Sequence, residues 1–223
     1  EPLRVVRGHI EVSDRPGHES LIANEPDTYD WPQFDENTAS SICYTSGTAG
    51  FPKGVVYSHR STVLHSYAAC MQDALGICTT DVTLPVVPMF HVNAWGVPYA
   101  AAMTGSKLVL PGPGLDPANL MELIESEQAT TLLGVPTVWM ALLASARPQG
   151  KRMSSVKKVV IGGSACPPSM IEAWEHEHGA RGGVHRHADA DQVGEHGERH
   201  EQRGLGARLA ELLVDVGDAD PFL

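Results

Sequence analysis

A stretch of eleven residues, 44–54, combines the chemical groups that bind phosphate. It reads YTSGTAGFPKG, in which three glycines allow backbone N–H groups to approach an anion. The hydroxyls of Thr45, Ser46 and Thr48 can donate hydrogen bonds to phosphate oxygens, and Lys53 supplies positive charge. The pattern predicts a phosphate-binding loop, although composition alone also fits a glycine-rich hairpin without a ligand.

This loop differs from the Walker A motif of P-loop nucleotide-binding proteins. That motif needs Gly-Lys followed by Ser or Thr at the start of a helix. Here Lys53 follows Pro52 and precedes Gly54 and a strand-like run. The sequence therefore argues against P-loop GTPases and kinases.

A second segment, residues 88–96, reads PMFHVNAWG and places a histidine near a tryptophan. His91 can donate a hydrogen bond to an oxyanion, and Trp95 offers a large, rigid surface that can close an apolar channel. The alternative for each is an ordinary core position whose polar atoms are satisfied by neighbours.

Two short glycine-containing segments follow, GVPT at residues 134–137 and GGSAC at residues 162–166. The first is typical of a turn that leads from a strand into a helix. The second lacks bulky side chains, so a flat base could pack closely against its backbone. Taken alone, each segment also fits an ordinary turn.

In this order along the chain, the four segments resemble the motifs of the adenylate-forming (AMP-binding) superfamily. Acyl-CoA synthetases, luciferases and peptide-synthetase adenylation domains belong to it, and the second segment resembles medium- and long-chain fatty acyl-CoA synthetases in particular. One departure is Ala49, because the family usually has two threonines where this chain has Thr48 and Ala49. Without this hydroxyl, one hydrogen bond to the ligand would be missing, which would cost about 1 kcal/mol. The resemblance covers about residues 3–179.

The resemblance implies an activity with two steps. ATP activates a fatty acid as an acyl adenylate, and coenzyme A, the co-substrate, then displaces AMP to give acyl-CoA. The implied catalytic residues are Lys53, Thr48 and His91, and Thr48 also contacts Mg²⁺. The residues implied to bind the nucleotide are Thr45, Ser46, Gly47, Thr48, Gly50, Lys53, Gly162, Gly163, Ser164 and Ala165. Those implied to line the acyl pocket are His91, Val92, Trp95, Gly96, Val135 and Pro136.

Short apolar runs alternate with amphipathic segments and supply the framework for these residues. Strands are expected at residues 3–12, 39–44, 53–57, 82–88, 107–110, 130–133 and 156–161. Helices are expected at residues 58–76, 94–103, 117–127, 136–146 and 168–178. This alternation predicts an α/β fold with a mainly parallel sheet and flanking helices, as in the large N-terminal domain of adenylate-forming enzymes. Ser58 and Asp116 are expected to cap their helices.

Composition narrows the classes of partner. The 223 residues are 42% hydrophobic, enough for a packed core, and the formal charge of −11 argues against nucleic acid and anionic membranes. The four cysteines form no CxxC pair, which favours reduced thiols and a cytoplasmic protein. Two charge-free stretches, 82–106 and 129–146, contain prolines and polar residues, so neither predicts a transmembrane segment. Small-molecule substrates are the expected partners, and a homodimer is compatible with the sequence.

The chain is expected to divide at residue 179. Residues 1–179 are interpreted as a partial adenylation domain, incomplete at both ends. Residues 180–223 read as a divergent, disordered tail with a short helix near 205–216, and they resemble a shifted reading frame. They lack the aromatic-Gly-x-Thr-Glu motif that the family places there. The chain is therefore expected to be a fragment with little activity alone.

Three alternatives remain open. One is an unrelated, doubly wound NTP-binding protein whose loop matches the motif by accident. Of the other two, the first is an inactive remnant of the same family that binds nucleotide or acyl groups, or an unstable truncated product. The second is a metal site in the tail region, since His176, His178, His185 and His187 form two HxH pairs. Residues 175–178 could equally be the solvated end of a helix.

Overall fold

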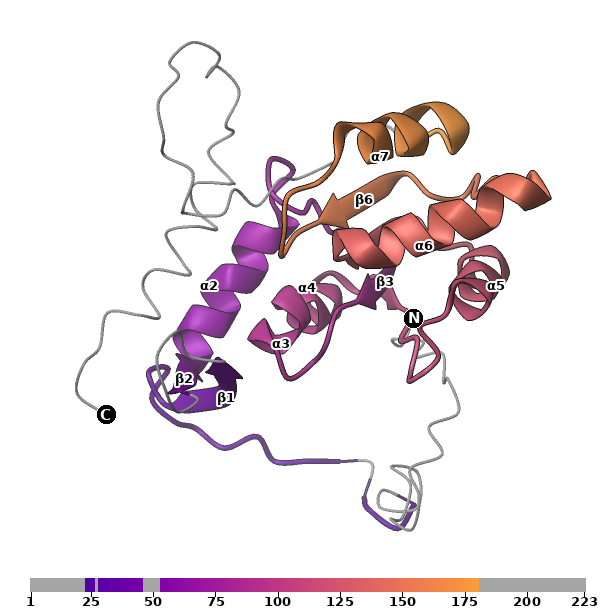
Figure 1. Cartoon of the computed structure of the whole chain (residues 1–223). Helices are drawn as coiled ribbons and strands as arrows, with labels where there is room; N and C mark the ends of the chain where they lie inside the picture. Colours follow the sequence, from indigo (N-terminus) through magenta and orange to yellow (C-terminus); the bar gives the residue numbers. More distant parts are fainter. Residues whose placement is uncertain (1–22, 27, 46–52, 181–223) are drawn as a thin grey trace, which may run out of the picture.

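The computed structural model describes residues 23–26, 28–45 and 53–180. A two-stranded antiparallel sheet and a four-stranded parallel sheet lie in these ranges (Figure 1). The small sheet is a hairpin of β1 (Ala39–Thr45) and β2 (Lys53–Ser58), in which Thr45 is paired with Lys53. The strands expected at 39–44 and 53–57 are thus confirmed, and residues 46–52 between them lie outside the described residues.

The large sheet is entirely parallel, with the order β4-β3-β5-β6. Its strands are β3 (Val82–Val86), β4 (Lys107–Leu108), β5 (Thr131–Gly134) and β6 (Lys158–Ile161). Each pair of consecutive strands is connected through helices, as parallel neighbours require. The predicted α/β class with a mainly parallel sheet is confirmed, and the hairpin is an antiparallel addition to it.

Local sequence signals start the helices. α2 (His59–Cys70) begins with a capping box, in which the Ser58 side chain accepts from the Ser61 N–H and the Ser61 hydroxyl accepts from the Ser58 N–H. α5 (Pro117–Glu127) begins after Asp116, whose carboxylate accepts from two backbone N–H groups of the first turn. Both predicted caps are confirmed.

The remaining helices cover the parallel sheet. They are α3 (Val92–Trp95), α4 (Val97–Thr104), α6 (Pro136–Ala146), the 3₁₀ turn η1 (Arg147–Gln149), α7 (Pro168–Glu172) and the π-helical turn η2 (Ala173–Glu177). Every one of these helices within the described ranges falls short of the length and hydropathy that a bilayer-spanning helix needs.

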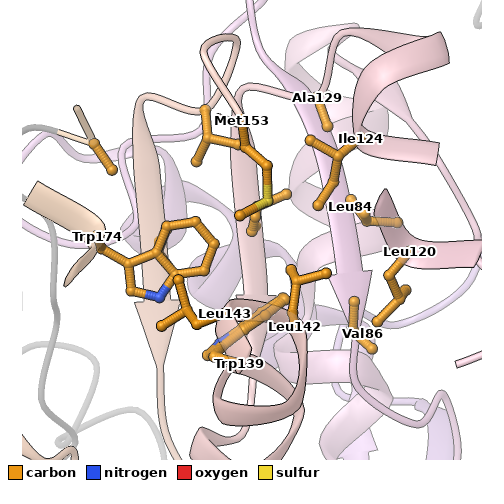
Figure 2. Packing of buried hydrophobic residues seen from close by; sticks show 14 of the residues in the cluster. Leu84, Val86, Leu120, Ile124, Ala129, Trp139, Leu142, Leu143, Met153 and Trp174 are labelled. Atoms are coloured by element: carbon orange, nitrogen blue, oxygen red, sulfur yellow. The ribbon is translucent and has the colours of Figure 1, made fainter. Parts of the chain in front are cut away.

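Both faces of the sheet are buried, which explains why its strands are mostly apolar. Leu132 and Val159 point toward the core formed with α5, α6 and α7, whereas the next residues, Leu133 and Val160, join the opposite core with α2 and α4. This alternation is the two-residue period of a strand. Figure 2 shows the first core, where the rings of Trp139 and Trp174 meet edge to face with centroids 6.0 Å apart.

Asp81 joins the amino ends of β3 and β5. Its Oδ1 accepts from the hydroxyls of Thr130 and Thr131 at 3.1 Å each, and its Oδ2 accepts from the Cys78 N–H at 3.0 Å. Burial raises the pKa of Asp81, but these hydrogen bonds and the positive charge of Lys158 together hold that pKa below its ordinary value. The carboxylate therefore stabilises the edge of the sheet opposite the site described below.

Several expected boundaries were wrong. The helix expected at 58–76 ends at Cys70, because the backbone of Met71 is extended. The helix expected at 94–103 is split at Gly96, and the one expected at 168–178 changes into a π-helical turn after Glu172. The strand expected at 107–110 is shorter, with β4 at Lys107–Leu108 followed by a single bridging residue, Val109. The elements expected at 3–12 and 205–216 lie outside the described residues.

Candidate functional site

The carboxyl ends of three parallel strands bring separated segments together. The chain reaches His91 after β3, Val135 after β5 and Gly162 after β6. In open parallel sheets, ligands bind at this edge. A methyl group placed on Gly162 would lie 3.1 Å from the Trp95 ring, and one on Gly163 would lie 3.2 Å from the Val135 side chain. Two segments predicted for the acyl pocket therefore contact the segment predicted for adenine.

Trp95 is carried by an unusual backbone turn. Residues 92–95 have φ angles of 49, 50, 51 and 57°, and Gly96 follows at 66°, so the turn winds left-handed. It is closed by the Gly96 N–H, which donates to the carbonyl of Val92 at 3.2 Å. A left-handed turn costs L-residues about 1–2 kcal/mol per residue. Strain of this kind persists only where surrounding contacts impose it.

Gly96 fits this turn for steric reasons as well as for its φ angle. A methyl group at Gly96 would lie 2.5 Å from Nδ1 of His65 on α2. The turn is consequently pressed against α2, and Ala94 at its centre is fully buried. Trp95 itself is half-buried, as is Val92.

The side chain of Asn93 connects this turn to the hairpin. Its Nδ2 donates to Oγ of Ser41 at 2.9 Å, and its Oδ1 accepts from Sγ of Cys43 at 3.3 Å. Ser41 and Cys43 are alternate residues of β1, so both side chains lie on the same face of that strand. Asparagine also tolerates the left-handed region better than most residues. Sequence reasoning missed this role of Asn93.

His91 precedes the left-handed turn and is exposed. Its backbone N–H donates to the carbonyl of Pro88 at 3.2 Å, and its carbonyl accepts from the Ala94 N–H at 3.1 Å. The backbone of His91 is therefore fixed while its ring remains accessible to a ligand.

The segment predicted for adenine is an open turn after β6. Gly162 is buried, whereas Gly163, Ser164 and Ala165 are exposed. Gly163 has a φ of 82°, which favours glycine at this position. After the neighbouring strand β5, Pro136 is buried at the start of α6. The exposed backbone of residues 163–165 is thus available to a flat group.

The predicted phosphate loop is described only at its two ends. Thr45 is the last residue of β1 and Lys53 the first of β2, and their pairing brings the two backbones together. Ser46, Gly47, Thr48 and Gly50 lie outside the described residues, and so does the predicted Mg²⁺ contact of Thr48. The roles assigned to these residues stay predictions.

The structure describes two of the four histidines considered for a metal site, His176 and His178. His178 is 3% exposed, lies beside Trp174 with ring centroids 5.2 Å apart and planes tilted by 53°, and accepts from the Met153 N–H through Nδ1 at 3.3 Å. The interpretation of residues 175–178 as a solvated helix end is wrong for His178. Among the described residues, no group of three or more His, Cys, Asp or Glu side chains could hold a metal ion. His185 and His187 lie outside those residues.

Comparison with known proteins decides the family. Residues 3–185 match the AMP-binding enzyme family. The chain belongs to that family. It is 59% identical over 162 residues to the medium-chain-fatty-acid–CoA ligase of Ectopseudomonas oleovorans. This alignment covers 73% of this chain and 30% of that protein. It is 55% identical over 162 residues to the 3-methylmercaptopropionyl-CoA ligase of Ruegeria pomeroyi, again 73% of this chain and 30% of the relative.

A solved structure of the family has the same fold. The o-succinylbenzoate–coenzyme A synthetase of Bacillus subtilis, in complex with ATP and magnesium ion, gives a TM-score of 0.55 at 22% identity. The match covers 64% of this chain and 29% of that one. The predicted resemblance to adenylate-forming enzymes is therefore confirmed for family and fold. The chain spans 30% of the length of both curated relatives.

Proposed function

We propose that this chain contributes the nucleotide- and acyl-binding part of an AMP-forming fatty acid–CoA ligase. The observation that carries the proposal is the contact of Trp95 with Gly162. It places the residue proposed to gate the acyl channel beside the segment proposed to bind adenine. A reaction that joins a carboxylate to the α-phosphate of ATP needs this adjacency, because its rate depends on holding both reactants together.

In the first step, a carboxylate oxygen attacks the α-phosphorus of ATP, and pyrophosphate leaves with the electron pair of the broken P–O bond. Lys53 and the hydroxyls of the loop hold the departing phosphates, and Thr48 contacts the Mg²⁺ that accompanies ATP. His91 donates a hydrogen bond to the substrate carboxylate and orients it. In the second step, the thiol of coenzyme A attacks the acyl carbon and releases AMP.

The proposed acid is a medium- to long-chain fatty acid. The 59% identity to a medium-chain ligase supports this class. A short thioether acid, 3-methylmercaptopropionate, is the second candidate, supported by 55% identity to a ligase named for it. The two acids differ in length, and a channel closed by the Trp95 ring would select acids by length.

We also propose a cytoplasmic location and small-molecule partners for this ligase. Cys43, Cys70 and Cys78 are free thiols, as a reducing compartment maintains them. A homodimer is proposed as its assembly, and sedimentation over a range of concentrations tests it. A single monomeric species at every concentration would reject the dimer.

The proposed activity is tested by exchange of labelled pyrophosphate into ATP, with decanoate or 3-methylmercaptopropionate as the acid. Because the chain spans only part of its relatives, we expect weak exchange that requires the acid, and no thioester formation. A higher exchange rate with decanoate than with 3-methylmercaptopropionate supports the fatty acid class. A higher rate with 3-methylmercaptopropionate supports the thioether acid. ATP binding without exchange would identify an inactive remnant, and absence of both would refute the proposal.

The loop is tested by Lys53→Ala, which removes the positive charge proposed to hold the departing phosphates. We expect the affinity for ATP, measured by calorimetry, to fall about tenfold, as for a charge-assisted hydrogen bond. Lys151→Ala is the control, since Lys151 is an exposed lysine whose only ion pair in the described part of the chain is with Glu125 at 3.9 Å. Equal affinities of the two variants would remove Lys53 from the site.

A further inference from the structure

The left-handed turn of residues 92–96 lies between two parts of the proposed nucleotide site. On one side, Trp95 rests on Gly162, which leads into the segment proposed to bind adenine. On the other side, Asn93 is bonded to β1, which leads into the proposed phosphate loop. Any change in the orientation of this turn therefore moves the Trp95 ring relative to both.

Asn93 meets two requirements at once. Its backbone lies in the left-handed region, with φ 50° and ψ 44°. Its amide donates to one β1 side chain and accepts from another, Ser41 and Cys43. Alanine would supply neither hydrogen bond and would strain the backbone further, whereas glycine would keep the backbone and lose only the bonds. Substitution by glycine consequently isolates the contribution of the amide.

We infer that Asn93 is a positioning residue that fixes Trp95 against Gly162 by fastening the left-handed turn to β1. The inference rests on the proposed function for its effect on acyl selection, but not for its effect on Trp95. The hydrogen bonds hold the turn in one rotational position, and the indole follows. Loss of the bonds leaves the ring free to take other positions at the acyl channel.

The position of Trp95 can be measured without any enzymatic activity. The chain has four tryptophans, so labelling with fluorotryptophan gives four ¹⁹F resonances, and Trp95→Phe identifies the one from Trp95. We expect Asn93→Gly and Ser41→Ala to shift or broaden this resonance. The resonances of the buried Trp139 and Trp174 report whether the core remains folded.

Ser40→Ala is the matched control, because Ser40 is adjacent to Ser41 on the same strand. Its hydroxyl bonds the carbonyl of Tyr57 at 2.9 Å and the hydroxyl of Thr62 at 3.0 Å, and so stays within the hairpin and α2. We expect Ser40→Ala to leave the Trp95 resonance in place. If Asn93→Gly unfolds the core, Ser41→Ala still tests the inference. An unchanged Trp95 resonance in the folded Ser41→Ala and Asn93→Gly variants would overturn it.

A second readout links the turn to substrate selection. In pyrophosphate exchange, we expect Asn93→Gly to raise KM for decanoate about three- to tenfold, the factor for one neutral hydrogen bond, with a smaller effect on KM for ATP. Asn93→Asp should rescue both readouts, since its carboxylate accepts from Cys43 and from a rotated Ser41 hydroxyl. Absence of exchange in the unsubstituted chain would refute the proposed function, while the fluorine spectra would still decide the role of Asn93.

Discussion

The indole of Trp95 covers Gly162 so closely that a methyl group at Gly162 would lie 3.1 and 3.2 Å from two of its ring carbons. Trp95 comes from the turn after β3, and Gly162 follows β6, two strands away in the sheet. The contact therefore joins segments that are 67 residues apart (162 minus 95). A glycine of the segment proposed to bind adenine thus lies directly against Trp95, the largest residue of the proposed acyl channel.

Gly162→Ala tests this contact. We expect the methyl group to push the ring outward and to lower the free energy of unfolding by about 1–3 kcal/mol, the usual effect of overpacking. The ¹⁹F resonance of Trp95 should shift in the same variant. Gly105→Ala is the comparison for the resonance alone, because a methyl group at Gly105 meets no atom within 4 Å, whereas the φ of 72° at Gly105 strains alanine and lowers stability by itself. A Trp95 resonance that stays unchanged in Gly162→Ala would contradict the proposed packing.

The burial of His178 predicts a dependence of stability on pH. Burial lowers the pKa of His178 most, the positive charges of Arg152 and Arg147 lower it further, and Glu177 opposes them. The ring must stay neutral because Nδ1 accepts the Met153 N–H. The folded pKa thus lies below the unfolded pKa, so the stabilisation is complete above about pH 6.5 and is lost as pH falls toward the folded pKa.

We therefore expect the free energy of unfolding, measured with urea, to decrease between pH 7.5 and pH 5.5. His178→Gln should reduce this slope, since a glutamine oxygen can accept from Met153 without titrating. His176→Gln, at an exposed histidine on the same turn, is the control and should keep the slope. Equal slopes in both variants would show that His178 does not cause the pH dependence.

The end of α5 predicts a stabilising substitution. Gln128 caps this helix with a φ of 55° and an exposed side chain. Gln128→Gly should raise the free energy of unfolding by about 0.5–1 kcal/mol, because glycine adopts this conformation without strain. Glu122→Gly, in the middle of the same helix, should lower it by about 1 kcal/mol. Two changes of the same sign in urea unfolding would contradict this interpretation of the cap.

Much of the framework could be predicted because its signals are local. Asp116 with Pro117 predicted the start of α5, and the helix expected at 136–146 matches α6, Pro136–Ala146. The alternation of short apolar runs with helices also predicted a parallel sheet. The resemblance to the family also indicated which segments would form the site, and their roles stay predictions.

The left-handed turn could not be predicted, because its cause is distant in sequence. Val92, Ala94 and Trp95 do not favour positive φ, and their local pattern indicates an ordinary helix. The contacts that impose the turn come from Ser41 and Cys43, about fifty positions earlier. The burial of His178 was missed for a similar reason, since its partner Met153 lies 25 residues away.

The division of the strands into two sheets has a consequence for local unfolding. β5 is buried along its whole length, whereas Ile42, Tyr44 and Val56 of the hairpin are 53, 63 and 43% exposed. The hairpin can therefore open at a lower free energy than the parallel sheet, and its amide hydrogens exchange with solvent first. A nucleotide held by the loop would stabilise the closed hairpin and slow exchange in β1 and β2, while exchange in β5 would continue at its own rate.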